Sequence, residues 1–66
     1  MNQEEYVKFH QVLMLMSHSA RSQKWLLRHN VLQQTLNEMV ELDHLVEYEK
    51  DSEIYYRATK KSREIW

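Results

Sequence analysis

The chain has 66 residues, with nine Lys or Arg against ten Asp or Glu, a net charge of −1, and no glycine, proline or cysteine. One small domain of this length buries only roughly 60% of its unfolded surface, and without cysteine it has neither a disulfide framework nor a cysteine-based zinc site. No apolar stretch approaches the ~20 residues that cross a bilayer and no signal-peptide pattern is present, so we expect a cytoplasmic protein that makes no membrane contact.

The first predicted element is an amphipathic helix over about residues 2–16. Apolar side chains recur there at spacings of three, four and three, which places them on one helical face: Tyr6, Phe9, Leu13 and Met16. Residues 12–16 are apolar nearly all round, so more than one face must be covered, either by the rest of the domain or by a second chain. We expect a homodimer, with a dimer or partner interface formed by Val12, Leu15, Met16 and Trp66.

Two further helices are predicted over about residues 20–28 and 31–42, joined by a short turn at residues 29–30. Ser19 is the expected N-cap of the second helix. Asn30 is expected to cap the third helix, with Gln33 reaching back as its capping-box partner. The third helix carries an apolar stripe of Leu32, Leu36, Met39 and Val40.

The hydrophobic period changes from helical to strand-like after residue 42. Val46 and Tyr48 alternate with glutamates, and the strand-forming run 54–56 follows a polar segment. We predict a hairpin over about residues 45–57, with a three-residue loop at 50–52 that pairs Tyr48 with Ile54 and Val46 with Tyr56, and a C-terminal tail over residues 58–66. The competing interpretation is one long helix from Asn30 onward, because Glu, Lys and Arg are abundant and no proline intervenes.

This succession of helix, corner and hairpin resembles winged helix-turn-helix domains of the MarR and ArsR type over about residues 19–59. The stretch LNEMVELDHLVEYEKDSEIYYRAT is similar to the family cadence of a helix, E-L-G-x-L-V, a wing and Y-Y-x-L-T. Asp43 and His44 stand where the family corner carries glycine, and both residue types tolerate the left-handed conformation better than most. The resemblance implies a mainly α fold with three helices plus a β-hairpin wing.

The resemblance also implies a small DNA-binding transcriptional regulator, of the size often encoded by phages and mobile elements. Its third helix would enter the major groove of double-stranded DNA. Gln33, Gln34 and Asn37 would contact bases, since amide side chains can bind adenine in a bidentate manner. Phosphate contacts would come from Arg21, Lys24, Arg28, Arg57, Lys60 and Lys61. The alternative for each of these residues is an ordinary solvated surface position.

The charge distribution opposes DNA binding and suggests a second hypothesis. Residues 1–30 carry a net charge of +2 and residues 57–66 a net charge of +3, whereas residues 31–56 hold one basic side chain against seven acidic ones. A recognition helix without Lys or Arg should bind DNA weakly as a monomer. The alternative is a protein-interaction module, an adaptor or inhibitor of a host factor such as a polymerase, whose acidic third helix and wing meet a basic partner.

Catalytic and metal chemistry have little support in the sequence. The histidines are eight, eleven and fifteen residues apart, which matches no ligand motif: His10, His18, His29 and His44. A G-x-S-x-G elbow and phosphate-binding loops both need glycine, which the chain lacks. We therefore expect no enzyme activity, no cofactor and no metal.

Overall fold

The computed structural model describes residues 2–17 and 19–65, and its first element is the helix α1 (Gln3–Met16). Asn2 caps this helix, because its Oδ1 accepts a hydrogen bond from the Glu5 backbone N–H at 2.8 Å. Ser17 ends the helix in the left-handed conformation, with φ of 54°, and its N–H bonds back to the carbonyl oxygens of Leu13 and Met14.

A two-residue strand, β1 (Arg21–Ser22), precedes the helix α2 (Gln23–Arg28). The prediction of a helix from residue 20 capped by Ser19 was therefore wrong. Ser22 is the cap, since its Oγ accepts a hydrogen bond from the Trp25 N–H at 3.1 Å. Residues 21 and 22 stay extended because they add to the open edge of a sheet formed much later in the chain.

Asn30 closes α2 instead of capping the next helix. Its φ is 70°, its N–H bonds to the Leu27 carbonyl oxygen, and the Val31 N–H bonds to the Leu26 carbonyl oxygen, both at 3.1 Å. This is a Schellman motif, which needs a left-handed residue just beyond the helix. The next helix, α3 (Gln33–Glu41), has Leu32 as its N-cap and no side-chain cap bond, so the predicted capping box at Asn30 was wrong.

The helix α3 also ends in a Schellman motif. Asp43 is left-handed, with φ of 69°, and the His44 N–H bonds to the Met39 carbonyl oxygen at 2.8 Å. The His44 side chain is buried, with its ring centroid 6.0 Å from that of Phe9.

The strands β2 (Leu45–Lys50) and β3 (Glu53–Ala58) form an antiparallel hairpin, so the chain does not continue as one long helix. The turn is Asp51-Ser52, with φ of 53° and 65°, and positive φ at both central residues is the signature of a type I′ turn. The predicted three-residue loop and its register were wrong by one residue. Tyr48 lies opposite Tyr55, and Val46 lies opposite Arg57.

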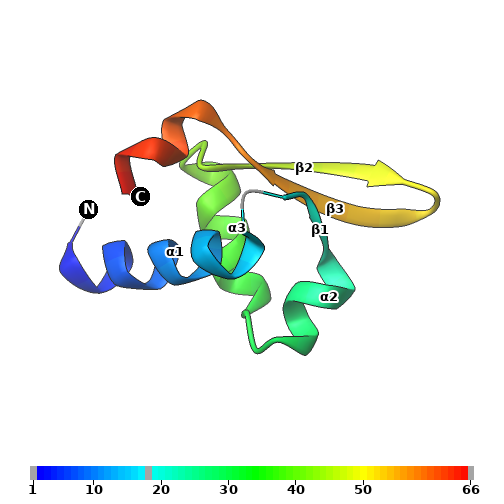
Figure 1. Ribbon diagram of the computed structural model, residues 1–66, viewed down its shortest axis with the longest axis horizontal. Helices are drawn as coiled ribbons and strands as arrows, with labels where there is room; N and C mark the ends of the chain where they lie inside the picture. Colours follow the sequence, from blue (N-terminus) through cyan, green and yellow to red (C-terminus); the bar gives the residue numbers. More distant parts are fainter. Residues whose placement is uncertain (1, 18, 66) are drawn as a thin grey trace.

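The hairpin joins β1 in a three-stranded antiparallel sheet of order β1-β3-β2 (Figure 1). One face of the sheet meets the helices, and the far end of the hairpin projects beyond them. The buried apolar side chains form a single core of Phe9, Val12, Leu13, Met16, Leu26, Val31, Leu36, Met39, Leu45, Tyr56 and Ile65. Together these elements make a compact α/β domain.

The segment predicted as a C-terminal tail contains the 3-10 helix η1 (Lys60–Ile65). This prediction was wrong because Ile65 contributes to the core and Ser62 is buried as well. His10 Nδ1–H donates a hydrogen bond of 2.8 Å to the Ile65 carbonyl oxygen, which holds η1 against α1. No helix within residues 2–17 and 19–65 is long and apolar enough to cross a membrane.

Candidate nucleic-acid interface

The solvent face of α3 carries the side chains that could read bases. Gln34, Asn37 and Glu41 follow one another at spacings of three and four, opposite the buried face formed by Thr35, Leu36 and Met39. Gln34 and Asn37 are exposed, and their amides can reach a ligand in solvent. This face is therefore part amide and part carboxylate.

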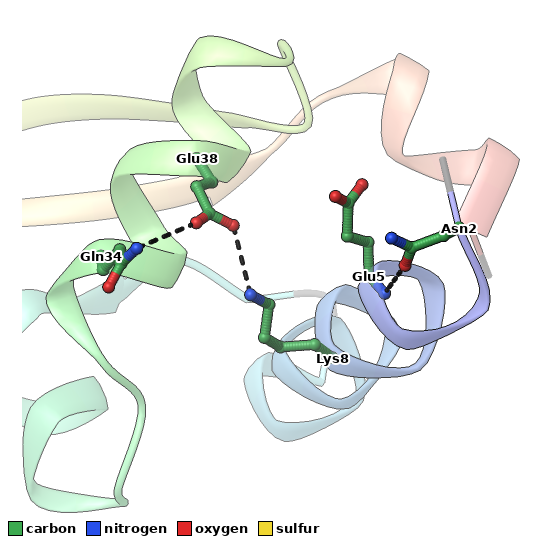
Figure 2. Close-up of polar contacts among 5 residues, drawn as sticks. All are labelled: Asn2, Glu5, Lys8, Gln34 and Glu38. Atoms are coloured by element: carbon green, nitrogen blue, oxygen red, sulfur yellow. Dashed lines mark hydrogen bonds and ion pairs between the residues drawn. The ribbon is translucent and has the colours of Figure 1, made fainter.

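The negative charge of Glu38, on the same helix, is compensated by an ion pair with a lysine of α1. Figure 2 shows the Lys8 ammonium of α1 reaching its carboxylate, with Lys8 Nζ 3.2 Å from Glu38 Oε2. The other oxygen, Oε1, accepts a hydrogen bond from Gln34 Nε2 at 3.5 Å. Glu41, by contrast, forms no ion pair within the described part of the chain. Glu41 is thus an exposed carboxylate without a compensating charge beside Gln34 and Asn37.

Gln33 is not available to contact DNA bases, because its amide is bonded within the fold. Its Oε1 accepts a hydrogen bond from Gln23 Nε2, and its Nε2 donates to Asn37 Oδ1 at 2.9 Å and to the Tyr56 hydroxyl at 3.0 Å. These bonds use both ends of the amide inside the fold. Gln34 and Asn37 therefore remain as the predicted base-contact residues with accessible amides.

Tyr56 connects this network to the hairpin, a role that the sequence analysis did not predict. The residue is fully buried, and its hydroxyl donates a hydrogen bond to Glu47 Oε2 at 3.2 Å. Burial raises the pKa of the Tyr56 phenol above its ordinary value, the Gln33 hydrogen bond opposes the rise, and the Glu47 carboxylate adds to it. The network fixes α3 relative to the sheet.

Two of the predicted phosphate contacts lie together on α2. Lys24 and Arg28 are one helical turn apart and both exposed. Lys24 Nζ lies 3.6 Å from Glu53 Oε1 of β3, but 79% of the Lys24 side chain remains accessible. Arg21 is more constrained: its Nε–H donates to the Met16 carbonyl oxygen at 3.3 Å, and its guanidinium carbon lies 4.6 Å from the Trp25 ring centroid.

Two of the other three predicted phosphate contacts, Lys60 and Lys61, lie away from this pair. Arg57 is exposed on β3, whereas Lys60 and Lys61 are exposed on η1. Figure 1 places η1 at the opposite end of the molecule from α2 and the hairpin turn. The six predicted residues therefore form no single basic surface.

The predicted interface residues also separate. Met16 is buried in the core of the chain itself. Val12 is also part of the core, but it lines one wall of a groove on the surface. Leu15 is partly buried beside a groove of about 380 Å³ between α1 and the α2–α3 turn, where Leu32 is 66% exposed. Trp66 and His18 lie outside the described residues.

The hairpin surface that faces away from the helices carries a stacked aromatic pair. The rings of Tyr48 and Tyr55 have centroids 5.8 Å apart and planes 20° apart. A one-residue error of register hid this pair from the sequence reasoning. The turn at Asp51-Ser52 has two residues instead of the predicted three, and composition does not distinguish the two lengths.

Within residues 2–17 and 19–65, no three His, Asp or Glu side chains come close enough together to hold a metal ion. Comparisons with protein-family models, with curated proteins and with solved structures found no match to this chain.

Proposed function

We propose that the chain is a winged helix-turn-helix domain that binds double-stranded DNA as a small transcriptional regulator. The supporting observation is the order of its elements: α1, β1, α2, α3 and then the β2–β3 hairpin, with β1 added to β3. A short turn joins α2 to α3, and α3 leads directly into the hairpin. In this arrangement α3 enters the major groove and the hairpin acts as the wing.

Gln34 and Asn37 are the proposed base contacts. Gln33 Nε2 donates to Asn37 Oδ1, which leaves the Asn37 NH₂ group facing solvent as a donor. Such a group suits an acceptor on a base edge, for example N7 of a purine or O4 of thymine. Gln33 accordingly serves as a positioning residue that orients Asn37.

Lys24 and Arg28 are the proposed phosphate contacts next to α3. They are opposed by Glu41, so each domain has little net attraction for DNA. A homodimer, proposed here to form through Leu15 and Leu32, would double the number of phosphate contacts without adding residues. Binding should therefore be weak for a monomer and steeply dependent on salt.

One observation favours a second function, that of a protein-interaction module. A hollow of about 300 Å³ lies between the start of α1 and the end of α3, with Phe9 and Leu42 as its apolar part and with Glu5, Glu38 and Glu41 around it. This combination suits the apolar stem and charged head of a lysine or arginine on a basic partner protein.

The deciding experiment is selection of duplexes from a randomised pool, followed by titration of the recovered sequence across salt concentrations. Lys24→Glu and Arg28→Glu should weaken binding and flatten its salt dependence. Asn37→Ala should reduce discrimination between sequences and leave most of the salt dependence. Arg63→Glu, an exposed charge reversal on η1, is the matched control.

The absence of duplex binding at about 50 mM salt, where electrostatic attraction is strong, would rule out the regulator. Charge reversal of Glu41 then tests the second function. Under that proposal it slows association with a basic partner.

A further inference from the structure

The outer face of the sheet, defined here as the face turned away from the helices, brings together residues that are not neighbours in the sequence. Side chains of directly opposed residues share a face, and successive residues alternate between faces. The pairing therefore places six hairpin residues on the outer face: Val46, Tyr48 and Lys50 from β2, with Glu53, Tyr55 and Arg57 from β3. Ser22 of β1, opposite Tyr55, continues the same row.

Charge divides between the two faces of the hairpin. Glu47 and Glu49 lie on the face toward the helices, opposite Tyr56 and Ile54. The outer face holds Lys50 and Arg57, both exposed. Its carboxylate, Glu53, is compensated by Lys24, whose Nζ lies 3.6 Å from Glu53 Oε1. The outer face is thus net basic, with Lys50 and Arg57 against Glu53, although the segment 31–56 as a whole is strongly acidic.

The two tyrosines occupy the middle of that surface. Tyr48 and Tyr55 stack with their ring centroids 5.8 Å apart and are both partly exposed. Lys50 lies two residues along β2 from Tyr48, and Arg57 lies two residues along β3 from Tyr55, toward the opposite end of the hairpin. The aromatic pair is therefore flanked by one cation at each end.

We propose that this outer face binds unpaired bases of a single nucleic-acid strand. Bases stack on Tyr48 and Tyr55, and the adjoining phosphates contact Lys50 and Arg57. Every base has a π-face, so aromatic stacking combined with cations that follow the backbone is a sequence-tolerant way to hold single strands. A duplex hides its base faces within the stack, so this site requires unpaired nucleotides.

This site is separate from the α3 surface of the proposed function and takes a different form of nucleic acid. Gln34 and Asn37 would read the edges of paired bases, whereas Tyr48 and Tyr55 would contact the faces of unpaired ones. Each activity can therefore fail without the other. The proposal gives the hairpin a ligand of its own, beyond the part of a wing that touches duplex backbone.

The test uses the full chain and a fluorescently labelled twelve-nucleotide oligodeoxythymidine, titrated by anisotropy at about 50 mM salt. Oligodeoxythymidine forms no duplex with itself, so any binding is to a single strand. We expect the unmodified protein to bind it. Tyr48→Ala should weaken binding about 5- to 150-fold, the range expected from loss of one stacking ring.

Three controls separate stacking from other effects. Tyr48→Phe keeps the ring and should bind as the unmodified protein does, whereas Tyr48→Leu keeps apolar bulk without a ring and should bind as weakly as Tyr48→Ala. Tyr6→Ala removes another partly exposed tyrosine, on α1, and should have no effect. Lys50→Gln and Arg57→Gln should each reduce the dependence of affinity on salt.

Absence of oligodeoxythymidine binding by the unmodified protein would overturn the proposal, as would equal affinity of Tyr48→Leu and Tyr48→Phe. A face made for a protein partner would give the first of these results. Asn37→Ala, measured with both ligands, distinguishes the two sites: it should impair sequence discrimination on duplexes and leave oligodeoxythymidine binding unchanged.

Discussion

Gln33 Nε2 donates a hydrogen bond to the Tyr56 hydroxyl across 3.0 Å, which joins the first turn of α3 to the buried side of β3. The bond connects residues 23 positions apart and extends on one side to Gln23 and on the other to Glu47. A side chain expected to contact DNA thus contributes to the alignment of the helix with the sheet.

Replacing Gln33 should lower stability. Gln33→Ala removes two donated bonds and one accepted bond, so the free energy of unfolding should fall by about 1–2 kcal/mol. Gln34→Ala, on the exposed face one residue later, should change it by less than about 0.5 kcal/mol. Urea unfolding followed by circular dichroism measures both. Equal stability of the two variants would mean that the network contributes nothing.

Tyr56 should make the fold sensitive to alkali. Its pKa is raised in the folded state by burial, so above its ordinary value near ~10 the unfolded chain releases this proton more readily than the folded one. The contribution of Tyr56 to the free energy of unfolding is therefore fully present below that pH and is lost as pH rises through the folded-state pKa. Unfolding free energies measured from pH 8 to 11 should decline in the unmodified protein and decline less in Tyr56→Phe. Parallel curves would contradict this assignment.

Glycine at position 52 should stabilise the hairpin. Ser52 has φ of 65°, a conformation that costs a residue with a Cβ about 1–2 kcal/mol and costs glycine nothing comparable. After allowance for the greater entropy of glycine in the unfolded chain, Ser52→Gly should gain about 0.5–1 kcal/mol. Ser19→Gly is the control. Ser19 is exposed and is not one of the described residues with positive φ, so the substitution should bring no gain in stability. Thermal melting of both variants provides the comparison.

The two methionines at the end of α1 should differ in how much stability their truncation costs. Met16→Ala empties a core position and should cost about 2–5 kcal/mol, which is a large part of the stability of so small a domain. Met14→Ala removes a side chain that is 57% exposed and should cost less than about 0.5 kcal/mol. Chemical denaturation of both variants tests this, and similar losses would place Met14 in a contact with a second molecule.

A charge at the rim of the groove beside Leu15 should prevent the proposed self-association. Leu32→Glu places a carboxylate at a side chain that is already largely exposed, so the fold should persist while the dimer dissociates. Sedimentation velocity at high micromolar concentration distinguishes the two states. A monomeric unmodified protein would contradict the dimer itself.

Helical periodicity predicted most of the core-facing residues of α1 and α3, because burial of one face leaves a direct mark on residue spacing. Phe9 and Leu13 of the α1 stripe and Leu36 and Met39 of the α3 stripe are buried. Tyr6 and Leu32, placed on the same stripes, are instead 40% and 66% exposed, so the prediction was wrong for the first residue of each stripe. Amphipathic spacing carries such information even without related sequences.

Turn and cap chemistry was predicted less well, because it depends on backbone angles and on distant partners. Nothing local distinguishes Ser19 from Ser22 as a cap until β3 is available to pair with residues 21 and 22. Nor does composition decide between a loop of two or three residues at Asp51, although that choice reverses which side chains share a face. Charge counted along the chain also failed to show which face of the hairpin is acidic, because Glu47 and Lys50 lie on opposite faces.

The hydrogen bond from His10 to the Ile65 carbonyl oxygen joins residues 55 positions apart and so encloses most of the chain in one loop. A contact of such sequence separation can form only after the intervening elements have brought its ends together. We therefore expect docking of η1 to be a late step of folding. Its amides should exchange with solvent sooner than those of α3 or β3, through brief detachment of η1 from α1 while the rest of the domain stays folded.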